Sequence, residues 1–328
     1  MEVGDLGERG LLERLHQFCA TGLVGDDAAV LSFPASRRLV VTTDTLVDGV
    51  HFSDRTTSAE DAGWRAVAAN LSDLASMGAF PIGITVSLAM PRDTPVDWVE
   101  GLYRGMKACL DRFESAIVGG DVCQSPVKSI SITAFGNVEP ELVLRRSQAK
   151  PGDSIVVTGV HGASRAGLAL LLEPDAEYPV SSEQYDRLLR AHQRPIPRFD
   201  AVSLLWKTWK TTENEPRVAG MDSSDGLADA VVQIARESGV SAQLWPESLP
   251  VSPDVTAMVS AETARNWTLY GGEDFELVLC LSPSHAQRFV EALPGASVVG
   301  EIVTGEGAWL VDGESREPLT MQGGFQHF

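Results

Sequence analysis

The chain has 328 residues, of which 44% are hydrophobic and 22% charged, so it is long enough for two globular domains. Its formal net charge of -19 argues against a nucleic-acid partner, because such binding depends on clustered Lys and Arg. The start of the chain is polar and acidic, unlike a signal peptide, and no apolar run approaches the ~18 residues that span a bilayer. We therefore expect a cytoplasmic protein with neither a membrane nor a nucleic acid as partner.

The first half of the chain alternates predicted strands with predicted helices. Residues 39–46 are rich in β-branched side chains and predict a strand that carries Asp44 near its end. Residues 61–78 have apolar side chains at helical spacing, with Asp73 on the opposite face. The other elements predicted in this half are strands at 82–88, 116–118 and 129–135 and a helix at 96–113.

The second half begins after a charged, turn-rich segment, residues 139–153. It shows a strand from 154, a glycine loop at 159–167 that opens a helix, a helix after Gly226 and an apolar strand at 275–281. Strands and helices mix in both halves, which predicts the α+β class. We place the two domains at residues 1–145 and 146–328.

Six short acidic motifs, most of them flanked by glycine or hydroxyl residues, recur along the chain. Carboxylates on tight turns can converge on a hard cation such as Mg²⁺, which prefers oxygen ligands and often binds substrate phosphates as well. The motifs predict a magnesium and nucleotide site. They are Gly25-Asp26-Asp27, Thr42-Thr43-Asp44-Thr45, Asn70-Leu71-Ser72-Asp73, Gly119-Gly120-Asp121, Asp222-Ser223-Ser224-Asp225-Gly226 and Gly271-Gly272-Glu273-Asp274.

Taken singly, most of these motifs also have a structural interpretation. Ser224 or Asp225 fits the N-cap of a helix, and a carboxylate on the polar face of a helix, such as Asp73, is usually solvated. Gly-Asp sequences, including Gly119-Gly120-Asp121, are typical of turns. Asp44 is harder to explain in this way, because Asp is depleted in strands.

Two further features have a functional and a structural interpretation. The loop at 158–164 could cradle a phosphate at a helix N-terminus, although it lacks the Gly-Lys-Ser/Thr ending of a Walker A loop. His51 could donate to a substrate phosphate or could be an ordinary surface residue.

In this order, the motifs resemble those of the thiamine-monophosphate kinases, a family in the superfamily that also holds aminoimidazole ribonucleotide synthetase and selenophosphate synthetase. The resemblance covers essentially the whole chain. Besides the acidic motifs, the segments that carry it are Asp48-Gly49-Val50-His51-Phe52, Arg146 ahead of Pro151-Gly152-Asp153, Phe275-Glu276-Leu277 and the ending Gly324-Phe325-Gln326-His327-Phe328. Each segment alone is weak evidence, but the ordered set is specific.

The resemblance implies a role for individual residues. His51 and Glu273 would meet the thiamine phosphate, and Phe325 would pack on the thiamine ring system. Gly120, Asp121, Arg146 and Ser224 would contact ATP. Several Mg²⁺ ions around the ATP phosphates would be held by Asp27, Thr43, Asp44, Asp73, Asp121, Asp222 and Asp225, with Thr42 assisting. The residues expected to be central to catalysis are Asp44, Asp121 and Asp225.

The resemblance also implies a fold and a reaction. The two domains would be mixed α/β-sheet domains of the aminoimidazole ribonucleotide synthetase type. The N-terminal domain would bind ATP and Mg²⁺ and pair its sheet across a homodimer, and the C-terminal domain would close over the active site. The γ-phosphoryl group of ATP would pass in line to the phosphate of thiamine monophosphate.

Two alternatives stay open at this point. One is a related ATP-dependent synthetase with another acceptor, although the only early cysteine, Cys19, lies in a helical-looking segment and the chain ends in Phe328 rather than Cys. The four cysteines form no CxxC pair, so a zinc or redox site is not predicted. The other alternative is a nucleotide sensor that keeps the acidic site without catalysis.

Overall fold

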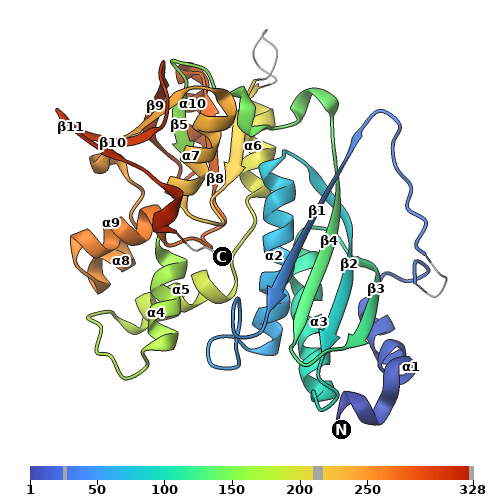
Figure 1. The fold of residues 1–328 in the computed structure, drawn as a ribbon. Coiled ribbons are helices and arrows are strands. Elements are labelled where there is room, and N and C mark those ends of the chain that lie inside the picture. Colours follow the sequence, from blue (N-terminus) through green and yellow to red (C-terminus); the bar gives the residue numbers. More distant parts are fainter. Residues whose placement is uncertain (25–27, 210–216, 325–328) are drawn as a thin grey trace. The chain divides into compact units, whose positions relative to one another are not determined.

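The computed structural model describes residues 1–24, 28–209 and 217–324, and the chain forms two compact units (Figure 1). The first unit comprises Met1–Leu74 and Ala79–Pro140, and the second comprises Ala75–Gly78 and Glu141–Phe328. Within the described residues, no helix is both long enough and apolar enough to cross a membrane.

The first unit is built on a four-stranded sheet in the order β1-β4-β2-β3. β4 is antiparallel to β1 and β2, and β3 runs parallel to β2. Parallel neighbours need a crossover connection, which α3 supplies. The elements are α1 (Val3–Leu15), a 3₁₀ turn (His16–Phe18), β1 (Arg38–Val47), α2 (Ala59–Ser76), β2 (Phe80–Met90), α3 (Val96–Arg112), β3 (Ile117–Gln124) and β4 (Ser129–Val138).

Buried and more exposed side chains alternate along these strands, so one face of the sheet packs into the hydrophobic core. Every second residue of β4 is buried. α2 and α3 pack closely because glycines stand where they meet: a Cβ at Gly63 would lie 1.9 Å from the Leu102 carbonyl oxygen, and one at Gly105 would lie 1.8 Å from that of Glu60. The predicted strands and helices of this half are confirmed.

Gly119-Gly120-Asp121 is not a turn, so that structural interpretation is wrong. The three residues lie inside β3 and pair with Thr85, Val86 and Ser87 of β2. A Cβ at Gly120 would lie 2.4 Å from the Val86 carbonyl oxygen. The glycine therefore permits a close approach of two strands rather than a change of chain direction.

The second unit has a seven-stranded sheet in the order β11-β10-β7-β9-β5-β8-β6, in which only the β10–β7 pair is parallel. Its helices and strands are β5 (Ser154–Val157), α4 (Ala163–Leu172), α5 (Ser182–Gln193), α6 (Phe199–Trp209), β6 (Ala219–Asp222), α7 (Leu227–Ser238), β7 (Ser241–Leu244), α8 (Pro253–Met258), α9 (Ala261–Tyr270), β8 (Leu277–Leu281), α10 (Pro283–Ala292), β9 (Ser297–Val303), β10 (Ala308–Asp312) and β11 (Ser315–Pro318). Short 3₁₀ turns occur at Pro140–Leu142, Arg146–Gln148, Pro246–Ser248 and Met321–Gly323.

The described residues of the second unit include two hydrophobic clusters. The larger one joins its sheet to α7, which buries Leu227, Val231 and Ile234 as the sequence predicts. β8 is buried at all five positions, as its apolar sequence predicts. The smaller cluster contains residues of α4, α5, α8 and α9, among them Leu170 and Leu188.

Candidate active site

In the first unit, oxygen-bearing side chains meet where β1 faces α2. The Thr42 hydroxyl donates to Asp73 Oδ2 at 2.5 Å, and the backbone N–H of Asp44 donates to Asn70 Oδ1 at 3.1 Å. Asn70 is buried and its amide donates to the Ala66 carbonyl at 3.0 Å, which fixes its orientation. Asp73 is thus a half-buried acceptor rather than a solvated carboxylate.

The structure does not bring the Thr43 side chain to this group. Successive side chains of a strand point to opposite faces. Thr42 and Asp44 are half-buried, whereas Thr43 is exposed and bonds to the Ile132 carbonyl at 2.9 Å and to the Thr133 hydroxyl at 3.3 Å, both in β4.

Gly120 and Asp121 lie on the exposed part of β3 and line a cavity of about 420 Å³. Cys19 and Tyr103 also line it, and burial raises the pKa of both. Both groups are therefore neutral near pH 7, and Asp121 is the acidic side chain that β3 contributes to the cavity wall.

His51 lies in the turn that follows β1. Its Nδ1 accepts the backbone N–H of Val47 at 3.1 Å. A neutral ring bound in this way carries its proton on Nε2, so it can act as a donor there.

In the second unit, the segment 222–226 links β6 to α7. Asp222 is buried at the strand end and accepts the Ser224 hydroxyl at 3.1 Å, while Asp225 is exposed. The N-cap of α7 is Gly226, which has no side chain to cap the helix. The interpretation of Ser224 or Asp225 as the N-cap is therefore wrong.

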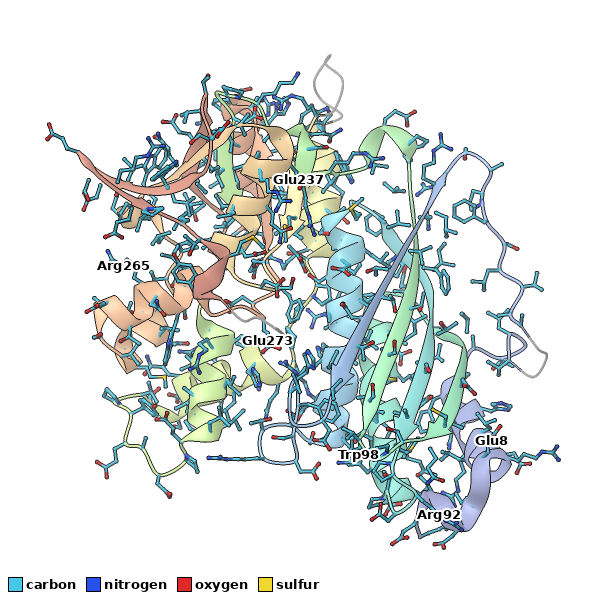
Figure 2. The ribbon with its side chains drawn as sticks, viewed as in Figure 1. Glu8, Arg92, Trp98, Glu237, Arg265 and Glu273 are labelled. Carbon is cyan, nitrogen blue, oxygen red and sulfur yellow. The ribbon has the colours of Figure 1, made fainter. Side chains whose placement is uncertain are left out.

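Glu273 lies beside this segment with a left-handed backbone, φ 57°. Its N–H donates to the Ser224 carbonyl at 2.7 Å, and the carboxylate of Glu273, which is labelled in Figure 2, lies 3.6 Å from Nδ1 of His192, in α5. The two acidic motifs of the second unit are thus in direct contact.

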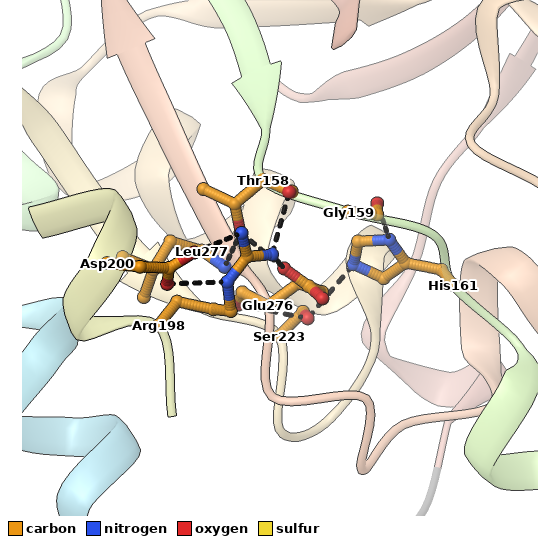
Figure 3. Close-up of polar contacts among 8 residues, drawn as sticks. All are labelled: Thr158, Gly159, His161, Arg198, Asp200, Ser223, Glu276 and Leu277. Atoms are coloured by element: carbon orange, nitrogen blue, oxygen red, sulfur yellow. Dashed lines mark hydrogen bonds and ion pairs between the residues drawn. The ribbon is translucent and has the colours of Figure 1, made fainter. Parts of the chain in front are cut away.

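A buried polar network that the sequence did not predict supports these motifs (Figure 3). His161 bonds through Nε2 to the Ser223 hydroxyl at 3.0 Å and through Nδ1 to the Gly159 carbonyl at 3.2 Å. Burial lowers the pKa of His161 to about 4. Glu276 pairs with Arg198, which also binds Asp200 at 2.9 Å. Burial of Glu276 raises the pKa of its carboxyl despite that pairing.

Only part of this network left a signal in the sequence. His161 stands in the predicted glycine loop, and Glu276 follows the last acidic motif by two residues. Arg198 follows a proline-rich turn and had no recognisable pattern around it.

The remaining residues predicted for the site are Arg146, Asp27 and Phe325. Arg146, in the 3₁₀ turn at 146–148, donates to Gln233 of α7 at 2.6 Å, and Gln233 donates to Asp229 at 2.6 Å. Asp27 and Phe325 lie outside the described residues. Among the residues that are described, no three or more His, Cys, Asp or Glu side chains form a group that could hold a metal ion.

Two family models divide the chain between them. "AIR synthase related protein, N-terminal domain" matches residues 25–138, and "AIR synthase related protein, C-terminal domain" matches residues 150–312. The chain therefore has the two-domain fold of AIR synthase related proteins, which confirms the predicted fold class. Hydrogenase maturation protein HypE shares this fold with a TM-score of 0.74 at 17% identity, over 96% of this chain and 95% of that chain.

Full-length similarity narrows the class. The chain is 47% identical to the thiamine-monophosphate kinase of Synechococcus elongatus over 99% of this chain and 98% of that protein. It is 34% identical to the kinase of Aquifex aeolicus over 100% of both. The chain belongs to the thiamine-monophosphate kinase family.

Solved structures agree with this assignment. The thiamine-monophosphate kinase of Stenotrophomonas maltophilia K279a superposes with a TM-score of 0.80 at 34% identity, over 92% of this chain and 95% of that chain. A structure of AaThiL complexed with AMPPCP and TMP gives a TM-score of 0.75 at 33% identity, over 97% of both chains.

Proposed function

We propose that this chain transfers the γ-phosphoryl group of ATP to the phosphate of thiamine monophosphate, giving thiamine diphosphate and ADP, in the cytoplasm. The observation that carries the proposal is the full-length match to thiamine-monophosphate kinases. AaThiL, which aligns over almost all of the chain, binds AMPPCP and TMP together, as a direct transfer between two phosphates requires.

The oxygen donors of the first unit have the chemistry that Mg²⁺ prefers. The side chains at the meeting of β1 and α2 offer hydroxyl, amide and carboxylate oxygens, which are the ligands of a hard cation. When bound, Mg²⁺ neutralises phosphate charge and allows two anions to approach. The residues proposed to hold it are Asp27, Thr42, Asp44, Asp73, Asp121, Asp222 and Asp225; Thr43 is left out because its side chain lies on the opposite face of β1.

The other proposed roles are those that the family resemblance implies. His51 donates from Nε2 to a substrate phosphate, and Glu273 and Phe325 bind thiamine monophosphate. Gly120, Asp121, Arg146 and Ser224 bind ATP.

The acceptor oxygen of a phosphate monoester is already ionised near pH 7, so the chain needs no strong general base. Its residues act by binding and by in-line positioning.

The outward face of the first unit's sheet supports a homodimer. Leu39 and Val41 of β1 are each 53% exposed. With Phe33, Ile82 and Phe135, Leu39 lines a hollow of about 510 Å³. An exposed apolar sheet face of this kind marks an interaction surface, and we propose that a second copy of the chain covers it.

The decisive experiment incubates the purified protein with ATP, Mg²⁺ and thiamine monophosphate and measures thiamine diphosphate and ADP. Asp44→Asn should lower kcat/KM by roughly 100-fold or more, because it removes an anionic oxygen from the metal site. Asp111→Asn is the matched control: this exposed α3 carboxylate pairs with Lys107 at 2.7 Å, so activity should stay within about threefold. Absence of thiamine diphosphate despite nucleotide binding would refute the proposal.

A further inference from the structure

The glycine loop before α4 already binds a carboxyl group from the chain itself. The carboxylate of Asp274 accepts the backbone N–H of Gly162 at 2.7 Å and that of Ser164 at 3.0 Å. α4 has Gly162 as its N-cap, with φ 86°, and no side-chain cap from that residue. A residue 112 positions away therefore satisfies the N–H groups that a helix N-terminus leaves unpaired.

Asp274 stands between two residues in a conformation that L-amino acids rarely adopt. Glu273 has φ 57° and Phe275 has φ 52°, and among the described non-glycine residues only Glu114 shares a positive φ. Each such residue costs on the order of 1 kcal/mol and persists only where its surroundings fix it. The backbone at 273–275 thus needs an external support.

Two contacts next to Asp274 lead directly to the proposed active site. The N–H of Glu273 donates to the Ser224 carbonyl at 2.7 Å, and the carbonyl of Glu276 accepts the N–H of Ser223 at 2.8 Å. The carboxylate of Asp274 is the anchor on the opposite side, since α4 is packed into the smaller hydrophobic cluster through Ala166 and Leu170.

We propose that Asp274 is a positioning residue that holds Glu273 in its left-handed conformation by fastening the segment 272–276 to the N-terminus of α4. The proposal rests on the function proposed for Glu273 in binding thiamine monophosphate. Asp274 acts through its neighbour and touches no substrate.

A double-mutant cycle tests this role. Asp274→Asn replaces one carboxylate oxygen by an N–H₂ group that faces a donor, so one of the two bonds to α4 is lost. We expect KM for thiamine monophosphate to rise roughly tenfold and KM for ATP to change less than threefold. Glu273→Gln should raise the same KM, and adding Asp274→Asn to it should raise KM no further. Independent, multiplicative effects, or an unchanged KM in Asp274→Asn, would overturn the proposal.

A matched control distinguishes the positioning role of Asp274 from a purely structural role. Asp153 is likewise buried, caps the N–H of Lys150 at 2.8 Å and binds Arg217 at 2.6 Å. Asp153→Asn should lower the thermal midpoint without changing KM for thiamine monophosphate. If Asp274→Asn cannot be purified, Asp274→Ser, whose hydroxyl still accepts one N–H, should show a smaller rise in KM with the same coupling to Glu273.

Amide hydrogen exchange tests the contact without turnover. In Asp274→Asn the N–H groups of Gly162, Ser164 and Glu273 should exchange faster, while in Asp153→Asn they should not. Unchanged exchange at Glu273 would overturn the positioning role. If the unsubstituted protein makes no thiamine diphosphate, the proposed function fails, and this measurement still decides whether Asp274 holds Glu273.

Discussion

His161 is a buried imidazole whose neutral state is tied to the folded protein. Burial lowers its pKa to about 4, whereas a His in an unfolded chain titrates near ~6.5. The unfolded chain therefore takes up a proton below pH 6.5 that the folded protein accepts only near pH 4. The contribution of this ring to stability is complete above pH 6.5 and is lost as the pH falls toward 4.

His161→Gln should make stability less sensitive to acid. Between pH 7 and pH 4.5, the unsubstituted protein should lose about 2–3 kcal/mol more unfolding free energy than the variant, as urea titrations at a series of pH values would show. Asp274 titrates in the opposite sense, because burial raises its pKa to about 7. It is present in both proteins, so their difference isolates His161. Parallel pH profiles would contradict the assignment.

At the scale of single residues, the sequence predicted which side chains share a face of a strand, but it could not predict which distant side chains form hydrogen bonds. The alternation of a strand already implies that Thr42 and Asp44 share a face that Thr43 does not. The bond from Thr42 to Asp73 depends on how β1 packs against α2, and the bond from Gly162 to Asp274 joins residues 112 positions apart. Local patterns contain no information about such pairs.

At the scale of elements, β3 shows how a glycine can act through close packing. Its Gly-Gly-Asp sequence has the composition of a turn, yet the chain continues as a strand because Gly120 faces the backbone of β2. Elements such as α3 and β4 were predictable because their apolar residues recur with the spacing of a helix or a strand over many positions. A single steric contact with another strand leaves no periodic signal.

Gly120→Ala should destabilise the first unit by about 2 kcal/mol or more, since its Cβ would lie 2.4 Å from the Val86 carbonyl oxygen and force β3 away from β2. Gly119→Ala is the control. Its Cβ would meet only the Thr85 methyl group at 3.4 Å, an ordinary contact, so its effect should stay within about 1 kcal/mol. Denaturant unfolding measures both, and equal losses would disprove the steric explanation.

At the scale of the whole molecule, the proposed dimer can be tested through the outward face of β1. Val41→Glu would place a charge in the apolar contact and should weaken self-association roughly 100-fold or more, because an unpaired buried charge is costly. Val127→Glu, at a residue 44% exposed between β3 and β4, is the control. Analytical ultracentrifugation should find twice the mass of one chain for the unsubstituted protein and the control. A monomeric unsubstituted protein would argue against the dimer.

The sequence also indicated the family and the two-domain fold, because the acidic motifs keep their order along the chain. It did not indicate which elements support those motifs. His161, Arg198 and Asp274 act on the proposed site from the loop before α4, from the residue before α6 and from the segment before β8, and only the folded unit brings these together.

The tethered carboxylate at α4 has a consequence for competition among anions. The Asp274 carboxyl group belongs to the chain, so it is present at an effective concentration set by the fold, in the millimolar range or above, and dissolved anions do not easily displace it. The N-terminus of α4 is therefore closed to orthophosphate, to pyrophosphate and to the phosphates of nucleotides. An enzyme whose two substrates are both phosphate esters gains selectivity in this way, because a helix end that would attract either of them at the wrong place is already saturated.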